Sequence, residues 1–256
     1  MSAIAANLAE CRARVAAAAT AAARAPEQVR LVAVSKTKPV EDLMVAYNEG
    51  QRHFGENLAH TSTLYRLHPP LPLLYRMSQV QELVDKAAQM PSDIQWHFIG
   101  TLQSNKCKLV AVIPNLFAVE TVDGIKKADT LHKALVQAQR ATPLNVFVQL
   151  NTSGEESKGG ILPTETLQVA THILEKCPTL KLAGLMTIGS PGRDATGGPN
   201  PDFKCLSDCR DLIKAAHGID LELSMGMSDD FEHAIEMGST NVRVGSVIFG
   251  ARAGKV

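Results

Sequence analysis

The sequence predicts an α/β fold, a (β/α)8 barrel formed by a single domain over residues 1–256. Short apolar segments rich in β-branched residues alternate with helical segments eight times along the chain. Most of the apolar segments end in polar side chains, and about 250 residues is a typical length for eight such units. An open, doubly wound parallel sheet has the same alternation and remains the structural alternative.

A helical segment precedes the first strand. Ile4, Leu8, Cys11 and Val15 recur at helical spacing, which predicts an amphipathic helix. The same stretch is rich in Ala and Arg and poor in acidic residues, as organelle transit peptides are. We expect an integral helix and a cytoplasmic protein, with organelle targeting as the alternative.

The first strand is predicted at residues 31–36, where an apolar run ends at Ser35 and Lys36. Pro39 suits the first turn of the helix that follows, and Gly50 ends that helix. This strand and helix form the first β-α unit.

The remaining units repeat this pattern. Strands are predicted at residues 53–57, 95–100, 116–120, 145–151, 181–188, 220–226 and 241–245. The helices between and after them are predicted at residues 81–90, 106–112, 124–140, 164–175, 203–216 and 228–237.

Composition excludes several classes of function. The 26 basic and 26 acidic residues balance, so no long-range field favours nucleic acid or an anionic membrane. No apolar run approaches the roughly 18 residues that a membrane span needs. The five cysteines are odd in number and scattered, which suits a reducing compartment. Cys205 and Cys209 lack a nearby second pair of ligands, so no metal site is predicted.

The chemistry is expected at the carboxyl ends of the strands, where barrel active sites lie. Lys36 stands there, either as a side chain that merely extends to solvent or as a partly desolvated amine that acts as a base or bonds a carbonyl. Gly245 and Ser246 follow the eighth strand, where barrels commonly bind phosphate, and Ser228 is a second phosphate candidate. An amine opposite a phosphate site suggests pyridoxal 5′-phosphate.

Six short motifs occur in order at the predicted strand ends. They are VSKTKP at residues 34–39, FGEN at 54–57, WHFIGTLQSNK at 96–106, ETVD at 120–123, LSMGMSD at 223–229 and RVGS at 243–246. Together these motifs resemble the pyridoxal phosphate homeostasis proteins, and the resemblance covers nearly the whole chain. The resemblance implies a barrel like the amino-terminal domain of bacterial alanine racemase, the type III fold of pyridoxal phosphate proteins.

The resemblance also implies a cofactor site, with pyridoxal 5′-phosphate held as a Schiff base on Lys36. It places Arg243 at the pyridine nitrogen, and Gly245, Ser246 and Ser228 at the phosphate. The other cofactor-binding residues are expected at strand ends and in the turns after them: Asn57, Ser224 and Met227.

Family members bind this cofactor and help to maintain its supply, and no catalysed reaction is established for them. A cationic Arg243 would keep the pyridine nitrogen unprotonated and weaken the ring as an electron sink. Racemisation also needs an acid-base group on the face opposite the lysine, usually from a partner domain, and none of the three tyrosines (47, 65 and 75) lies in a recognised motif.

We therefore expect a cofactor carrier rather than an enzyme. It would be a monomer that has pyridoxal phosphate-dependent apoenzymes as possible recipients and binds neither nucleic acid nor membrane. A weakly active racemase or decarboxylase is the alternative, and a cofactor-free protein-binding scaffold is a third.

Residues 58–79 depart from the family pattern. In relatives the FGEN motif is followed almost directly by a Val-Gln-Glu helix, which resumes here at Val80. The intervening sequence LHPPLPLL at residues 67–74 contains three prolines, which forbid a continuous helix. One hypothesis is a lid over the pocket, and the alternatives are a gene-model artefact or a disordered excursion.

Overall fold

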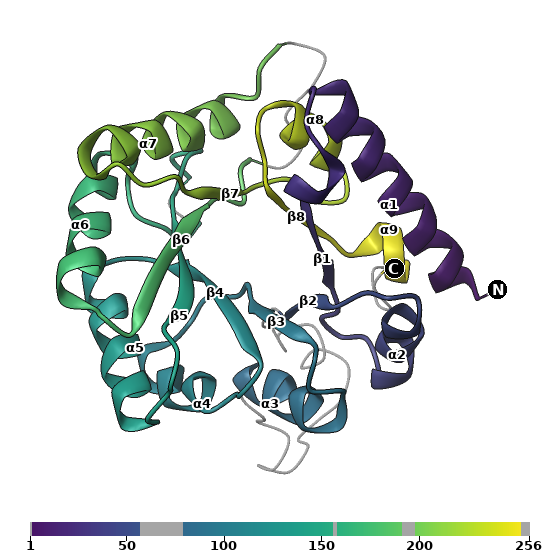
Figure 1. Ribbon diagram of the computed structural model, residues 1–256, viewed down its shortest axis with the longest axis horizontal. Helices are drawn as coiled ribbons and strands as arrows, with labels where there is room; N and C mark the ends of the chain where they lie inside the picture. Colours follow the sequence, from purple (N-terminus) through teal and green to yellow (C-terminus); the bar gives the residue numbers. More distant parts are fainter. Residues whose placement is uncertain (1, 57–78, 156–157, 191–197, 252–256) are drawn as a thin grey trace, which may run out of the picture.

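The chain folds as a closed barrel of eight parallel strands surrounded by helices (Figure 1). The computed structural model describes residues 2–56, 79–155, 158–190 and 198–251. Each strand pairs with its neighbours in chain order, and β1 closes the barrel against β8, with Ala33 opposite Val244. The (β/α)8 prediction is therefore confirmed, and the open-sheet alternative is wrong.

The strands agree closely with the predicted segments. They are β1 (Arg30–Val34), β2 (His53–Glu56), β3 (Gln95–Phe98), β4 (Leu116–Val122), β5 (Leu144–Gln149), β6 (Leu180–Met186), β7 (Glu222–Ser224) and β8 (Asn241–Val244). The largest difference is at β7, which was predicted at residues 220–226 and has only three residues, because the chain turns at Gly226 with a φ of 94°.

The helices cover the outside of the barrel. The α-helices are α1 (Ala3–Ala21), α2 (Val40–Asn48), α3 (Gln79–Gln89), α4 (Cys107–Ala111), α5 (Ile125–Gln137), α6 (Thr166–Lys176), α7 (Pro201–His217), α8 (Phe231–Glu236) and α9 (Ser246–Phe249). Short 3-10 turns lie at η1 (Pro26–Gln28), η4 (Ser104–Lys106) and η5 (Pro163–Glu165). Sequence analysis did not predict α9, which has only four residues. No helix among the described residues has the length and apolar character that crossing a membrane requires.

The predicted first helix is an integral part of the fold. Ser2 caps α1 by accepting a hydrogen bond from the Ala5 amide, and the helix packs against α2, α8 and α9. Leu8 and Cys11 are fully buried, so the helix contributes to the core between the barrel and its outer layer. All five cysteines are free thiols.

The barrel interior contains a small apolar cluster separate from the main core. Ala118, Phe147 and Met186 form it, from β4, β5 and β6. The Phe147 ring lies against Gly184, where an added Cβ would stand 2.5 Å from its Cε1 atom. The added Cβ would stand even closer to the backbone carbonyl oxygen of Glu222, so a glycine is required at this position of β6 for both β7 and the ring to fit.

Candidate functional site

A cavity of about 410 Å³ opens at the carboxyl ends of β1 and β8. Its volume is within the range of small-molecule sites. Apolar side chains supply part of its wall: Val34, Ile99, Met186 and Ile188. Six of the eight predicted site residues line it: Lys36, Met227, Ser228, Arg243, Gly245 and Ser246.

The other two predicted residues differ in their placement. Ser224 is fully buried and contacts Arg243 without lining the cavity, because it ends β7 inside the barrel. Asn57 and the insert at residues 58–79, apart from the first residue of α3, lie outside the described residues.

Lys36 lies on a tight turn between β1 and α2. The residue after it, Thr37, has a φ of 62°, a left-handed conformation that a β-branched residue rarely adopts. Lys38, the second lysine of the turn, donates hydrogen bonds from Nζ to the carbonyls of Phe249 (2.6 Å) and Ala251 (3.3 Å). Both lysines line the cavity, and Lys38 is held by the last residue of α9 and by the segment after it.

A buried ionic cluster supports this turn from below. Lys86 of α3 is 6% exposed, and its Nζ donates to the Ser35 carbonyl (2.9 Å), to Glu56 Oε1 (2.8 Å) and to Glu82 Oε1 (2.8 Å). Glu82 also accepts from the Thr37 amide at 3.1 Å. The cluster therefore fixes the backbone on both sides of Lys36.

Glu56 is the acid at the centre of this cluster. The Ser35 hydroxyl donates to its Oε1 at 2.6 Å, while its Oε2 has no hydrogen-bond partner among the described residues. Burial raises the pKa of Glu56 to about 7, although the neighbouring Lys86 acts to lower it. Sequence reasoning missed Lys86, and the glutamate of the FGEN motif was the only signal that pointed toward the cluster.

The two predicted phosphate segments meet at one wall of the cavity. The Gly245 amide donates to Ser228 Oγ at 3.3 Å, which brings the turn after β7 to the turn after β8. A Cβ on Gly245 would stand 3.3 Å from the Val34 carbonyl oxygen, so the turn packs closely on β1. Hydroxyl and backbone donors at this wall suit a phosphate group.

Arg243 enters the cavity from β8 with its guanidinium fixed on two sides. Its Nη1 donates to Ser224 Oγ at 2.5 Å, and its Nη2 donates to the Thr187 carbonyl at 2.8 Å. Burial lowers the pKa of Arg243, and the charges of Glu120 and Asp230 oppose that effect. An amine, hydroxyl donors and a guanidinium around one cavity fit the aldehyde, phosphate and ring nitrogen of pyridoxal 5′-phosphate.

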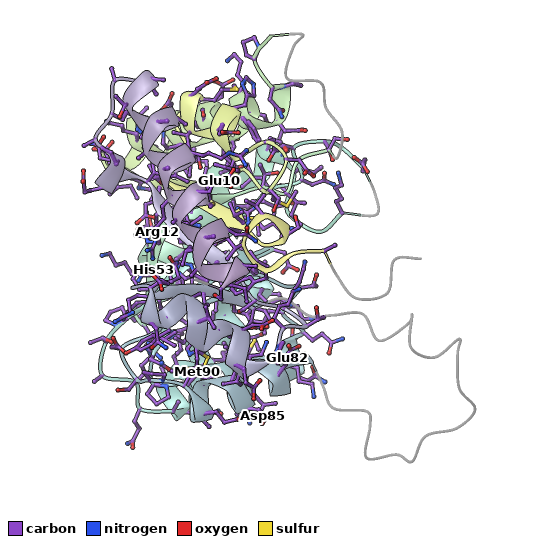
Figure 2. All side chains as sticks on the ribbon, turned by 90° about the vertical axis from the view of Figure 1, so that its right-hand side faces the viewer. Glu10, Arg12, His53, Glu82, Asp85 and Met90 are labelled. Atoms are coloured by element: carbon purple, nitrogen blue, oxygen red, sulfur yellow. The ribbon has the colours of Figure 1, made fainter. Side chains whose placement is uncertain are left out.

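A larger hollow of about 560 Å³ lies at the opposite end of the barrel, where His53 begins β2 (Figure 2). Its arginines are paired, because Arg30 bonds Glu222 and Arg52 bonds Asp93. The two arginines at this end are therefore each held by a carboxylate.

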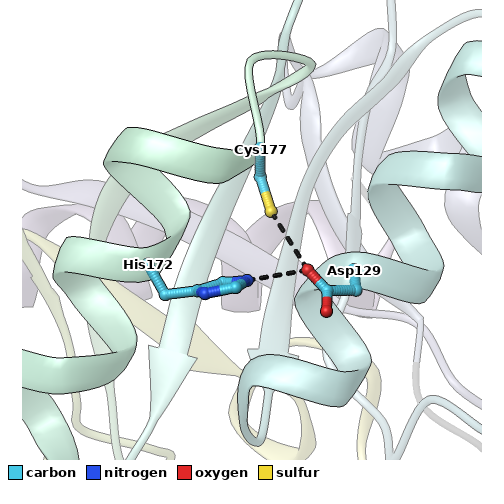
Figure 3. A group of neighbouring side chains, drawn as sticks. All are labelled: Asp129, His172 and Cys177. Carbon is cyan, nitrogen blue, oxygen red and sulfur yellow. Dashed lines mark hydrogen bonds and ion pairs between the residues drawn. The ribbon is translucent and has the colours of Figure 1, made fainter.

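One group of side chains outside the barrel has metal-binding residue types. Asp129 of α5 lies beside His172 of α6 and Cys177 (Figure 3). Asp129 Oδ1 accepts from His172 Nε2 at 2.7 Å and from Cys177 Sγ at 3.8 Å. Burial and the nearby Asp129 raise the pKa of Cys177 to about 11, so the thiol is neutral near pH 7. Hydrogen bonding accounts for this arrangement, and we assign no metal to it.

Comparisons with known proteins agree with the fold and with the cavity. The alanine racemase N-terminal domain family matches residues 1–253. The pyridoxal phosphate homeostasis protein of Schizosaccharomyces pombe is 48% identical over 224 residues, which cover 88% of this chain and 84% of that protein. The human protein of the same name is 47% identical over 233 residues, which cover 88% and 77% of the two chains.

A solved structure extends the comparison. PipY of Synechococcus elongatus, determined with pyridoxal phosphate bound, superposes with a TM-score of 0.73 at 29% sequence identity and covers 96% of this chain and 100% of PipY. The domain match covers nearly the whole sequence, and the two relatives are well above 30% identical. The chain therefore belongs to the pyridoxal phosphate homeostasis proteins, which share the alanine racemase N-terminal domain fold.

Proposed function

We propose that this protein binds pyridoxal 5′-phosphate as a Schiff base on Lys36 and acts in the intracellular supply of the cofactor. The observation that carries the proposal is the single cavity that brings Lys36 together with Arg243 and the wall at Gly245. The names of the relatives and the pyridoxal phosphate bound to PipY support the same ligand. When bound, this cofactor supplies an aldehyde that condenses with an amine, with loss of one water.

Each part of the cavity has a separate task in this proposal. Lys36 Nζ forms the covalent bond, and the fixed turn beneath it sets the position of the amine. Ser228, Ser246 and the turn at Gly245 hold the phosphate, while Arg243 faces the pyridine nitrogen. Met227 contributes to the wall, and Ser224 positions Arg243 from inside the barrel. Asn57, which we also propose as a cofactor-binding residue, lies outside the described residues.

We propose a carrier rather than an enzyme because of the residues around the cavity. Its described lining contains no histidine, tyrosine or cysteine, and its ionisable side chains besides Lys36 and Arg243 are Lys38 and Asp229. A guanidinium at the pyridine nitrogen also disfavours chemistry that uses the ring as an electron sink. We propose apoenzymes that use the same cofactor as the recipients.

We propose that residues 1–256 form one domain and that the protein acts in the cytoplasm. Helix α1 supports the proposal of one domain, since it packs against α2, α8 and α9. We propose that residues 58–79 are an insert relative to the family pattern.

Transfer and turnover experiments distinguish a carrier from an enzyme. Protein loaded with pyridoxal phosphate is mixed with an apoenzyme that needs the same cofactor, and recovery of the apoenzyme's activity is followed over time. We expect recovery with the loaded protein and no change in added amino acids when the loaded protein is incubated alone. Loss of optical activity or release of carbon dioxide in the second incubation would support a racemase or a decarboxylase instead.

A further inference from the structure

A continuous line of polar side chains runs through the barrel from its amino end to Arg243. His53 Nδ1 lies 2.9 Å from His97 Nε2, and His97 Nδ1 lies 2.5 Å from Glu120 Oε1. Glu120 Oε2 lies 2.5 Å from Ser224 Oγ, which accepts the hydrogen bond from Arg243. We call these five residues the interior polar chain.

The contacts of Glu120 in the interior polar chain cross the barrel. Glu120 belongs to β4, whereas Ser224 and Asn241 belong to β7 and β8, which are not neighbours of β4 in the sheet. Asn241 Nδ2 donates to Glu120 Oε1 at 3.1 Å and to Ser224 Oγ at 3.0 Å. These bonds therefore join opposite walls of the barrel through its interior.

The two charged residues of the interior polar chain, Glu120 and Arg243, are shielded from solvent. Glu120 and Ser224 have no exposed surface, and Arg243 is 5% exposed. A buried carboxylate or guanidinium is strongly destabilising unless an opposite charge and hydrogen bonds compensate it. Glu120 is the carboxylate of the interior polar chain, and the Ser224 hydroxyl bridges it to Arg243.

The hydrogen bonds have one consistent direction. Arg243 can only donate, so Ser224 Oγ accepts from Arg243 Nη1 and gives its own proton to Glu120 Oε2. Glu120 also accepts from Asn241 and from His97 Nδ1. Burial acts to raise the pKa of Glu120, but the hydrogen bond and charge of His97 and the charge of Arg243 leave that pKa below its usual value. The hydrogen bonds from His97, Ser224 and Asn241 are thus all donated to an ionised Glu120.

We propose that Glu120 is the positioning residue for Arg243. The Ser224 hydroxyl donates to the Glu120 carboxylate and accepts from Arg243, and this link holds the guanidinium in one orientation at the cavity. The negative charge of Glu120 also compensates the positive charge of Arg243. Glu120 does not reach the cavity itself and acts only through Ser224. The consequence for the cofactor rests on the proposed function, whereas the coupling between Glu120 and Arg243 does not.

The coupling is measured on cofactor-free protein. Thermal unfolding is compared for the wild type, Glu120→Gln, Arg243→Gln and the double variant. We expect each single variant to lower Tm by about 10 °C, because each removes an opposite charge that compensates the remaining one, although His97 still contacts Glu120 and Asp230 still acts on Arg243. We expect the double variant to lower Tm by clearly less than the sum of the two single decreases, since it removes both charges. Additive losses would overturn the proposal.

The consequence at the cavity is measured with pyridoxal phosphate. We record the visible absorption band of the bound cofactor and the cofactor concentration that gives half-saturation. The same variants are compared with Ser224→Ala, which keeps both charges but removes the hydroxyl that bridges them. We expect Glu120→Gln and Ser224→Ala to shift the band in the same direction as Arg243→Gln and to weaken binding about tenfold. We expect no further shift when Glu120→Gln is added to Arg243→Gln.

A matched control removes a charge elsewhere. Asp129→Asn also replaces a carboxylate that binds a histidine, but it lies between α5 and α6 outside the barrel, so we expect the wild-type band and half-saturation. A Glu120→Gln or Ser224→Ala protein that folds and retains the wild-type band and half-saturation would overturn the proposal. A wild type that takes up no pyridoxal phosphate would refute the proposed function and leave the thermal test of the coupling intact.

Discussion

The substitution Glu56→Gln tests the buried cluster beneath Lys36 through the pH dependence of stability. It keeps the size of the side chain and removes its titration. Burial raises the pKa of Glu56 from 4.5 to about 7 in the folded protein, so the folded state holds this proton more tightly than the unfolded chain does. The resulting stabilisation is fully present below pH 4.5 and is lost as the pH rises to about 7.

The size of the effect follows from the two pKa values. One pKa unit corresponds to about 1.4 kcal/mol, so the interval from 4.5 to about 7 corresponds to about 3 kcal/mol. We expect the free energy of unfolding of the wild type, relative to Glu56→Gln, to decrease by up to this amount between pH 4.5 and pH 7.

The assay is urea denaturation of both cofactor-free proteins at several pH values within that interval. Glu232→Gln is the control, because the hydrogen bond from Arg14 lowers the pKa of Glu232; its stabilisation is lost only as the pH falls below about 4.5, so we expect little effect on the profile within the interval. Parallel profiles for the wild type and Glu56→Gln, or a wild type that gains relative stability toward pH 7, would refute the reasoning about Glu56.

Two further predictions concern the packing that positions the site. Gly184→Ala places a methyl group against the Phe147 ring inside the barrel, and we expect a loss of about 1–3 kcal/mol in urea denaturation, whereas wild-type stability would show that the ring has room to move. Leu8→Ala removes a fully buried side chain from α1, and we expect a loss of about 2–5 kcal/mol; a loss within experimental error would mean that this helix is dispensable to the core.

Much of the fold could be predicted from the sequence because it depends on local patterns. Apolar strands followed by helices recur with little interruption, and only β7 and α9 differ much from the prediction. Six of the predicted site residues line one cavity for a related reason, since the carboxyl ends of parallel strands meet at the same end of a barrel. The position of Lys36 in the sequence therefore already implied its position in space.

The supporting residues could not be predicted in the same way. Glu120 and His97 lie in the ETVD and WHFIGTLQSNK motifs, but no local pattern predicts that Glu120 contacts Ser224 and Asn241 across the barrel. Lys86 lies on a helix and donates both to the Ser35 carbonyl beside Lys36 and to Glu56, which is 30 positions away in the sequence. Such contacts depend on the closed barrel rather than on any local pattern.

The most direct test of the proposed function is the covalent attachment of pyridoxal phosphate. Wild-type protein, Lys36→Ala and Lys38→Ala are incubated with the cofactor, reduced with borohydride and digested, and the labelled peptide is identified by mass spectrometry. We predict a visible absorption band before reduction and a label on Lys36 in the wild type and in Lys38→Ala, with both lost in Lys36→Ala. A label on another lysine, or wild-type protein that stays colourless with excess cofactor, would contradict the assignment of Lys36 as the cofactor-binding residue.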